Sequence, residues 1–264
     1  MKSYDFEYDG LKLSDFGYII CNFDSGGLNI ISNGSQIEFN TINVLNGSKR
    51  ELVSSNYSEC LETTFQICKT PCNDNNFEIS INEIRELAKW LNRKEFHKFK
   101  LLNEEYTNLF FESSFNINRI ENNGSVVGLE LNMITNRPFA LKESVSIIIE
   151  NTEPNGSKFI ESISDEGGFI YPHTEIVINQ DGDLNIYNSL EDRNTYIANC
   201  VSGEVITMDY PMIESSLNSH KIQNDFNWNF FRIASDFNNR INDLTISIPC
   251  TIKLSYFPIV KVGI

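Results

Sequence analysis

The chain has 264 residues, of which 41% are hydrophobic and 22% charged, which is enough for two modest domains or one large one. Its formal net charge of -15 argues against a broad nucleic-acid-binding surface and against binding to anionic membranes, since both need clustered Lys and Arg. It contains no signal-peptide core and no apolar run of roughly 20 residues, so we expect a cytoplasmic product that leaves the cell only within an assembly, with no membrane insertion.

A long hairpin is predicted in the first third of the chain. Asn46-Gly47 marks a tight turn, and the basic pair Lys49-Arg50 follows it directly. Residues 61–67 alternate between apolar and polar types and are interpreted as the return strand. The tip of such a hairpin is expected to project. The basic pair there either meets an acidic partner or keeps a loop solvated.

One strong amphipathic helix is predicted over residues 81–91. Ser80 and Glu83 have the spacing of a capping box, and Ile79 and Ile84 that of a hydrophobic staple. Apolar residues recur at helical spacing, with Trp90 on their flank: Ile81, Ile84, Leu87, Ala88 and Leu91. A lone helix among many strands is expected to cover one face of a sheet, because neither can bury its apolar side alone.

Short strands separated by turn residues fill the second half. Asp181-Gly182 lies between the alternating segments 175–179 and 184–188, which predicts a hairpin. A second turn at residues 202–203 separates two further strands in the same way. Regular short strands of this kind are typical of a β-sandwich or jelly-roll domain.

The fold class predicted is therefore mainly β with one prominent helix. The front half is expected to be a β-barrel or sandwich that carries the helix, and the back half a β-sandwich. Arg137-Pro138 is typical of a strand end or linker, which places the expected domains at residues 1–138 and 139–264.

Two short patterns resemble metal sites but lack part of the ligand set. Cys68 and Cys72 are spaced as half of a zinc site, yet no second Cys or His pair follows at ligand spacing, so structural thiols are the favoured interpretation. Asp181 and Asp183 resemble a calcium loop whose glycine is at the wrong offset. No phosphate loop, nucleophile elbow or zinc-protease motif occurs. We expect no catalytic residue, no metal ligand, no cofactor and no enzymatic activity.

Aromatic residues cluster between positions 226 and 237. Trp228 and Phe226 are candidate glycan-contact residues, because rings on a sandwich face can stack on sugars. Core packing is the more typical role for most of the cluster, since alternating aromatics fill sandwich interiors. A carbohydrate-binding module is therefore an alternative function.

Several segments occur in a distinctive order: Phe6–Gly10, Leu13–Gly17, Asn46–Leu52, Ile84–Leu91, Gly182–Asn188, Gly203–Asp209 and Phe230–Ile233. In this order they resemble the distal tail (Dit) proteins of siphophages, the long, flexible-tailed bacteriophages, here those that infect Gram-positive bacteria. The likeness covers nearly the whole chain and is one of pattern more than of invariant motif. The last three segments resemble the galectin-like C-terminal domain of that family, and the front half its tail-tube-like domain.

This resemblance implies a structural hub at the tail tip, assembled in the host cytoplasm. Family members form a homo-oligomeric ring, usually a hexamer, with a central channel for DNA. Implied partners are other copies of the chain, the tail tube protein, a tail-associated hub protein and receptor-binding or baseplate proteins, with no specific nucleic acid. Asn46, Gly47, Lys49 and Arg50 become candidates for the oligomer or tube interface.

Two alternatives stay open at this point. The sandwich half supports a carbohydrate-binding protein that recognises glycans of the host cell wall, through Trp228 and Phe226. The second alternative is a tube or baseplate subunit of a contractile tail or a bacteriocin, because such subunits resemble the front domain of the family.

Overall fold

Two compact units make up the protein. The computed structural model describes residues 3–23, 36–45, 47–71 and 77–262. The first unit comprises the chain up to Lys142 and the segment from Val260 onward, and the second comprises Glu143–Ile259. Val260 and Val262 pack against the core of the first unit. The structure thus divides between Lys142 and Glu143, and residues 260–262 belong with the front half.

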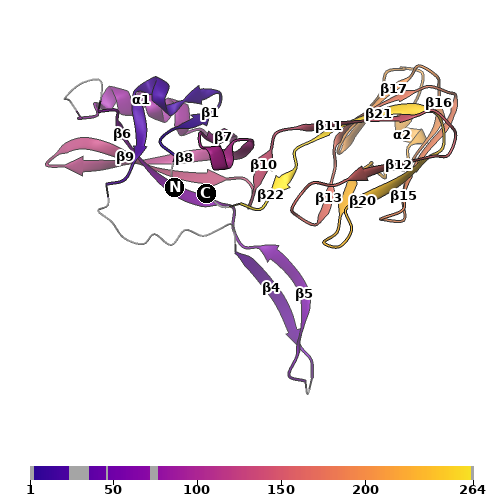
Figure 1. Cartoon of the computed structure of the whole chain (residues 1–264), viewed down its shortest axis with the longest axis horizontal. Coiled ribbons are helices and arrows are strands. Elements are labelled where there is room, and N and C mark those ends of the chain that lie inside the picture. The colour runs from indigo at the N-terminus through magenta and orange to yellow at the C-terminus, as the bar shows by residue number, and fades with distance from the viewer. Residues whose placement is uncertain (1–2, 24–35, 46, 72–76, 263–264) are drawn as a thin grey trace. The chain divides into compact units, whose positions relative to one another are not determined.

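A large antiparallel sheet forms the first unit (Figure 1). Its strands run in the order β2-β1-β7-β8-β9-β6-β3, and β10 pairs with both β8 and β22. The bounds are β1 (Phe6–Tyr8), β2 (Leu11–Lys12), β3 (Tyr18–Cys21), β6 (Glu62–Lys69), β7 (His97–Leu101), β8 (Leu109–Asn122), β9 (Ser125–Thr135), β10 (Ala140–Lys142) and β22 (Ile259–Val260). The short 3-10 helices η1 (Leu13–Phe16) and η2 (Glu104–Tyr106) lie in the connections.

Helix α1 (Ile81–Leu91) begins at the predicted capping box. The Glu83 N–H donates to Ser80 Oγ at 3.3 Å, and the Ser80 N–H donates to the Glu83 carboxylate at 2.8 Å. The buried side chains are Ile84, Leu87, Trp90 and Leu91, whereas the end residue Ile81, predicted on this face, is exposed. Each buried side chain contributes about 1.5–3 kcal/mol, while a helix this short is marginal alone, so α1 depends on the sheet it covers. Within the described residues, no helix is long and apolar enough to cross a membrane.

Aromatic rings fill the space between α1 and the sheet. Trp90 stacks on Phe6 with 5.8 Å between ring centroids, and its indole N–H donates to the Tyr8 carbonyl at 3.0 Å. Phe16, at the end of η1, stacks on Trp90 at 4.4 Å. Offset ring pairs of this kind add to the burial of their area. The cluster therefore holds α1 and η1 together against the sheet.

The strands β4 (Ile37–Asn43) and β5 (Arg50–Tyr57) form a separate antiparallel hairpin. The prediction that residues 61–67 are its return strand is wrong, because β6 pairs with β3 and β9 in the large sheet. Apolar–polar alternation marks a strand with one buried face, and β6 has such a face. Strand β5 is exposed on both faces and shows no such signal.

Two antiparallel sheets pack face to face in the second unit (Figure 1). Their orders are β11-β21-β14-β17-β18 and β12-β20-β15-β16, with a small β13–β19 pair beside them. The bounds are β11 (Val145–Asn151), β12 (Gly156–Glu161), β13 (Gly168–Ile170), β14 (His173–Ile178), β15 (Gly182–Asn188), β16 (Arg193–Cys200), β17 (Val205–Asp209), β18 (Met212–Ser215), α2 (Ile222–Asp225), β19 (Ile233–Ser235), β20 (Ile241–Ile246) and β21 (Cys250–Tyr256). The core is largely aliphatic, with Ile176, Ile186 and Leu244 drawn from both sheets. The prediction of a mainly β chain with one prominent helix is confirmed.

The turn at Asp181-Gly182 does not close a hairpin. Strand β14 pairs with β17 and β21, whereas β15 pairs with β16 and β20. The chain therefore passes from one sheet to the other at this turn, and again at residues 202–203 between β16 and β17. The alternation of apolar and polar residues along a strand indicates which side chains are buried, but it does not indicate which strand pairs with it.

A buried acid and histidine lie between β17 and α2. Glu204 is fully buried, and its Oε1 lies 2.6 Å from Nδ1 of His220, whose Nε2 is 3.3 Å from Oδ2 of Asp225. Burial acts to raise the pKa of Glu204, but hydrogen bonds from Ser215, the Val201 N–H and His220 outweigh it and lower the pKa below the ordinary 4.5. Glu204 therefore stabilises the fold as a carboxylate.

We predict that Glu204→Gln lowers the free energy of unfolding by about 2 kcal/mol at pH 7. Because the folded-state pKa is lowered, this stabilisation is complete above the ordinary pKa of 4.5 and is lost as the pH falls through the lower folded value. The difference in the free energy of unfolding between wild type and variant should therefore disappear at acidic pH. Urea unfolding at pH 7 and below pH 4 measures it; exposed Glu214→Gln is the control, and a gap independent of pH would contradict the prediction.

Candidate functional site

The β4–β5 hairpin exposes apolar side chains along its whole length. Leu45, in the loop between the strands, is 90% exposed, and six more large apolar residues are exposed: Ile37, Phe39, Ile42, Val44, Leu52 and Val53. An isolated two-stranded hairpin is at best marginally stable in water, and contiguous exposed apolar surface marks interaction sites. Among the described residues β4 pairs only with β5, so both outer strand edges are open. This hairpin has the properties of an element that is completed by a partner.

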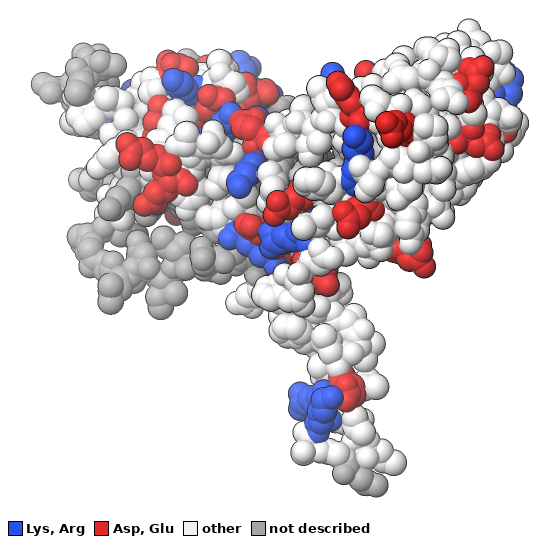
Figure 2. Space-filling view, turned by 45° about the vertical axis from the view of Figure 1, so that its right-hand side comes forward, with Lys and Arg blue, Asp and Glu red and all other residues white. Residues whose placement is uncertain are grey.

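The predicted interface residues lie at the loop end of this hairpin. Asn46 lies outside the described residues, and the Gly47 N–H donates to the Val44 carbonyl at 3.0 Å. Lys49 forms an exposed ion pair with Glu51 at 2.8 Å, and Arg50 lies opposite Asn43 in the last pair of the ladder. In Figure 2, basic and acidic atoms lie near the free end of the hairpin, and the rest of its visible surface is mostly uncharged. The hairpin therefore offers a basic group beside apolar ones.

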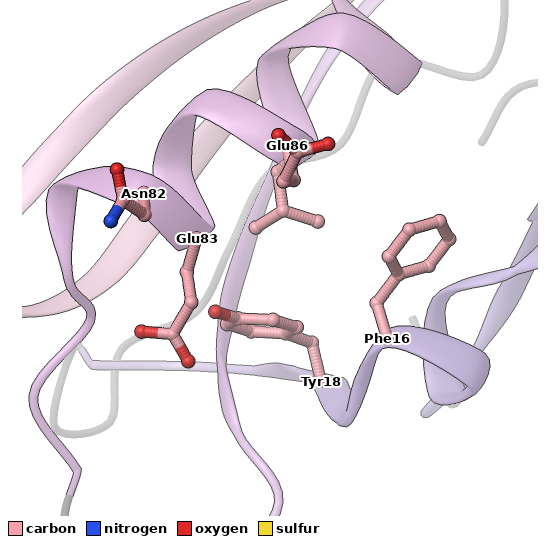
Figure 3. A pocket seen from close by; sticks show the side chains of 6 residues that line it. Phe16, Tyr18, Asn82, Glu83 and Glu86 are labelled. Carbon is pink, nitrogen blue, oxygen red and sulfur yellow. The ribbon is translucent and has the colours of Figure 1, made fainter.

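A pocket lies between α1, η1 and β3. Its volume is about 210 Å³, and its walls are Phe16, Tyr18, Asn82, Glu83, Glu86 and Leu87. Figure 3 shows the rings of Phe16 and Tyr18 on one side and the α1 side chains on the other, with the Tyr18 hydroxyl directed towards Glu83. Aromatic faces thus form one wall, and two carboxylates stand at the helix rim.

The polar groups of this pocket are unevenly satisfied. Tyr18 is 3% exposed and its hydroxyl has no hydrogen-bond partner, and burial followed by the nearby Glu83 charge raises its pKa to about 12. Burial opposes ionisation of Glu83, but Lys69 at 2.8 Å and Ser80 lower its pKa. Lys89 lowers the pKa of Glu86 through an exposed pair at 2.6 Å. The unpartnered hydroxyl is the group with most to gain from a ligand.

Exposed aromatic rings gather on the second unit. Tyr171 stacks on Tyr210 at 4.2 Å, and Tyr210 and Trp228 each contact the buried Phe230, at 5.3 Å and 6.4 Å. Trp228 is 56% exposed. Phe226, the other predicted glycan-contact residue, is only 4% exposed and packs in the core, so it offers no free ring face. The row Tyr171–Tyr210–Trp228 presents exposed rings instead.

The described residues hold no cluster of side chains with the make-up of a metal site. No group of three or more His, Cys, Asp or Glu side chains among them is placed to hold a metal ion. Cys72 lies outside the described residues, while Cys68 is half-buried and Cys60 exposed, both as free thiols.

The pocket and the tyrosine row have no signal in the local sequence. Tyr18 and Glu83 come from distant parts of the chain, and Glu83 was interpreted only as part of a helix cap. Tyr171 and Tyr210 are likewise brought together by the sandwich. A pattern search confined to a few neighbouring residues has no means of pairing them.

A mainly β protein of two units, with an open apolar hairpin, has the build of a structural part that functions within an assembly. Comparison of the chain with known protein families supports its assignment to this class of structural proteins. Residues 1–137 match the family described as phage tail protein N-terminal domain, and residues 139–256 match the phage tail C-terminal domain. The chain belongs to this family of phage tail proteins.

Among solved structures, the chain resembles the Dit protein of phage SPP1, described as a paradigm of the hub adsorption apparatus in phages that infect Gram-positive bacteria. The two share 12% sequence identity and a TM-score of 0.68 over 97% of this chain and 99% of that one. At this identity the likeness shows a common fold. No curated protein sequence matches the chain.

We predict that Tyr18→Phe raises the free energy of unfolding by about 1 kcal/mol, because it removes a buried hydroxyl that has no partner. Tyr8→Phe is the matched control. The Tyr8 hydroxyl is buried but donates to the Ser113 carbonyl at 3.1 Å, so the same change there should lower stability. Urea unfolding of dilute protein measures both, and equal losses in the two variants would contradict the prediction.

Proposed function

We propose that this chain is a structural hub of the phage tail tip. Copies of it form a closed ring, usually of six in this class, that joins the tail tube to a tail-associated hub protein and to receptor-binding or baseplate proteins. The ring leaves a central channel for DNA and carries out no reaction. It assembles in the host cytoplasm and resides at the tip of the virion tail.

The open hairpin is the observation that carries this proposal. Its apolar residues are solvated in the single chain, and docking them on a neighbour removes that surface from water. A hairpin that docks on a different patch of the next copy makes a head-to-tail contact, and such contacts generate rings when the rotation closes. The residues at 47–50 then lie in the contact between copies.

The family match and the fold likeness to the SPP1 protein support the same role. The net charge of -15 adds to it, because an acidic protein repels DNA that must slide through a channel without binding to its wall.

We predict that the double variant Lys49→Glu, Arg50→Glu weakens ring assembly by about tenfold or more, because like charges at an interface cost several kcal/mol. Size-exclusion chromatography with light scattering and negative-stain electron microscopy measure the ring. Wild-type protein is expected to give a ring of six 30.3 kDa chains.

Lys221→Glu, Lys253→Glu is the matched control, since both lysines are exposed on the second unit and the change in charge is the same. It should leave the ring intact. Rings that form equally well in both double variants would remove the basic pair from the interface, and wild-type protein that stays monomeric at high concentration and is missing from purified tail tips would overturn the hub.

Binding of cell-wall glycans is the second candidate function, favoured by the exposed rings of Tyr171, Tyr210 and Trp228. Flat aromatic faces offer apolar contact to the faces of sugar rings. The row belongs to one folded unit, so it needs no neighbouring copy. This function is compatible with the hub.

We predict that, if glycans bind here, Trp228→Ala and Tyr210→Ala each lower affinity on a cell-wall glycan array by about tenfold or more, as expected for truncation of an aromatic anchor. Phe237→Ala is the control, because Phe237 is more exposed than either ring and lies outside the row. Equal losses in all three variants, or an array with no binding by the wild type, would reject this second function.

A further inference from the structure

The size of the α1 pocket limits what it can hold. Its 210 Å³ lies below the roughly 300–1,000 Å³ typical of small-molecule sites. It is large enough for the end of one long side chain. Its aromatic wall is held in place, because Phe16 stacks on the buried Trp90 and Tyr18 belongs to strand β3.

The chemistry of the walls favours an arginine. A guanidinium stacks on aromatic faces such as Phe16, pairs with carboxylates and donates several hydrogen bonds at once. The Tyr18 hydroxyl is buried and without a partner, and its oxygen can accept one of those bonds. Glu86 is available at the rim, because its only ion pair with another described residue is the exposed one with Lys89, a kind of pair that contributes little.

Arg50 at the loop end of the hairpin has the matching properties. It is exposed, it forms no ion pair among the described residues, and the neighbouring Lys49 is already paired with Glu51. Leu45 in the adjacent loop is available to cover the apolar side of the same pocket. No arginine is among the described residues that line the pocket, and Arg50 and Glu86 are both exposed within one chain, so both are open to a contact with another copy.

We propose that Arg50 of one copy inserts into the pocket of the next copy, between the aromatic wall of Phe16 and Tyr18 and helix α1, and pairs with Glu86. This inference rests on the proposed ring and names the contact that closes it. The basic hairpin end meets an acidic helix rim, so the charges are complementary across the interface. Each copy supplies one hairpin and one pocket, which is what a head-to-tail ring requires.

A charge swap in the full-length chain tests the contact. Arg50→Glu and Glu86→Arg alone should each weaken ring assembly about tenfold or more, and the double variant that carries both should recover to within about threefold of wild type. Sedimentation velocity over a concentration series gives the assembly constants. Both positions are exposed, so the fold should survive, and a thermal unfolding curve checks this.

Two controls match the changes in charge. The first control is Arg85→Glu, because Arg85 is on the same helix but does not line the pocket. The second is Glu104→Arg, because Glu104 is an exposed residue of η2. Both should assemble as the wild type does. If the wild type forms rings but the swap variants behave like these controls, the contact is wrong and the hub proposal stands. If the wild type forms no ring at all, both proposals fall.

Cross-linking provides a measurement that does not depend on affinity. In Arg50→Lys, a carbodiimide condenses the introduced amine with a carboxylate at contact distance, forming an amide and converting the reagent to its urea. Mass spectrometry of mixed light and ¹⁵N-labelled protein should find position 50 of one copy joined to Glu86 of another. Cross-links from position 50 only to other surface carboxylates, or only within one copy, would overturn the contact.

Discussion

The packing of Trp90 is the interaction on which the surface of the first unit depends. Its ring is buried against Phe6 and Phe16, and its N–H is bonded to the Tyr8 carbonyl. Because a buried N–H without a partner costs about 1–3 kcal/mol, this bond selects one rotation of α1 about its axis. That rotation places Glu86 at the rim of the pocket and η1 opposite it. An assembly contact at this site thus rests on a rigid part of the core.

The β4–β5 hairpin, in contrast to helix α1, is not packed against a core. Strands β4 and β5 have no core of their own, since their apolar residues face solvent on both sides, whereas β6 next in the chain buries one face in the sheet. A two-stranded element that buries so little within its own chain gains most of its stability from a partner. In the proposed hub, an exposed hairpin without a core therefore meets a packed helix and sheet, and the ring forms where the two surfaces complement each other.

The second unit differs from the first in how it uses aromatic residues. Its core is built mainly from Ile and Leu of two facing sheets, and several rings remain on the outside. In the first unit many rings, such as Phe6 and Phe115, are buried in the core between helix and sheet. The sandwich thus buries its core without a neighbour, while the front unit carries the open hairpin.

The sequence alone determined the features that depend on neighbouring residues. The Ser80–Glu83 capping box, the turn near Gly47 and the mainly β class follow from hydrogen bonds and periodicities within a few positions, and each can be identified without the fold. Only the tertiary structure decided which strands pair and which surfaces are shared. Strand β6 belongs to the large sheet and not to the predicted hairpin, and the turn at 181–182 joins two sheets. Phe226, predicted at the surface, is buried. The pocket between Tyr18 and α1 arose in the same way. The physical reason is that burial depends on which distant segments pack together, and local spacing carries no record of that choice.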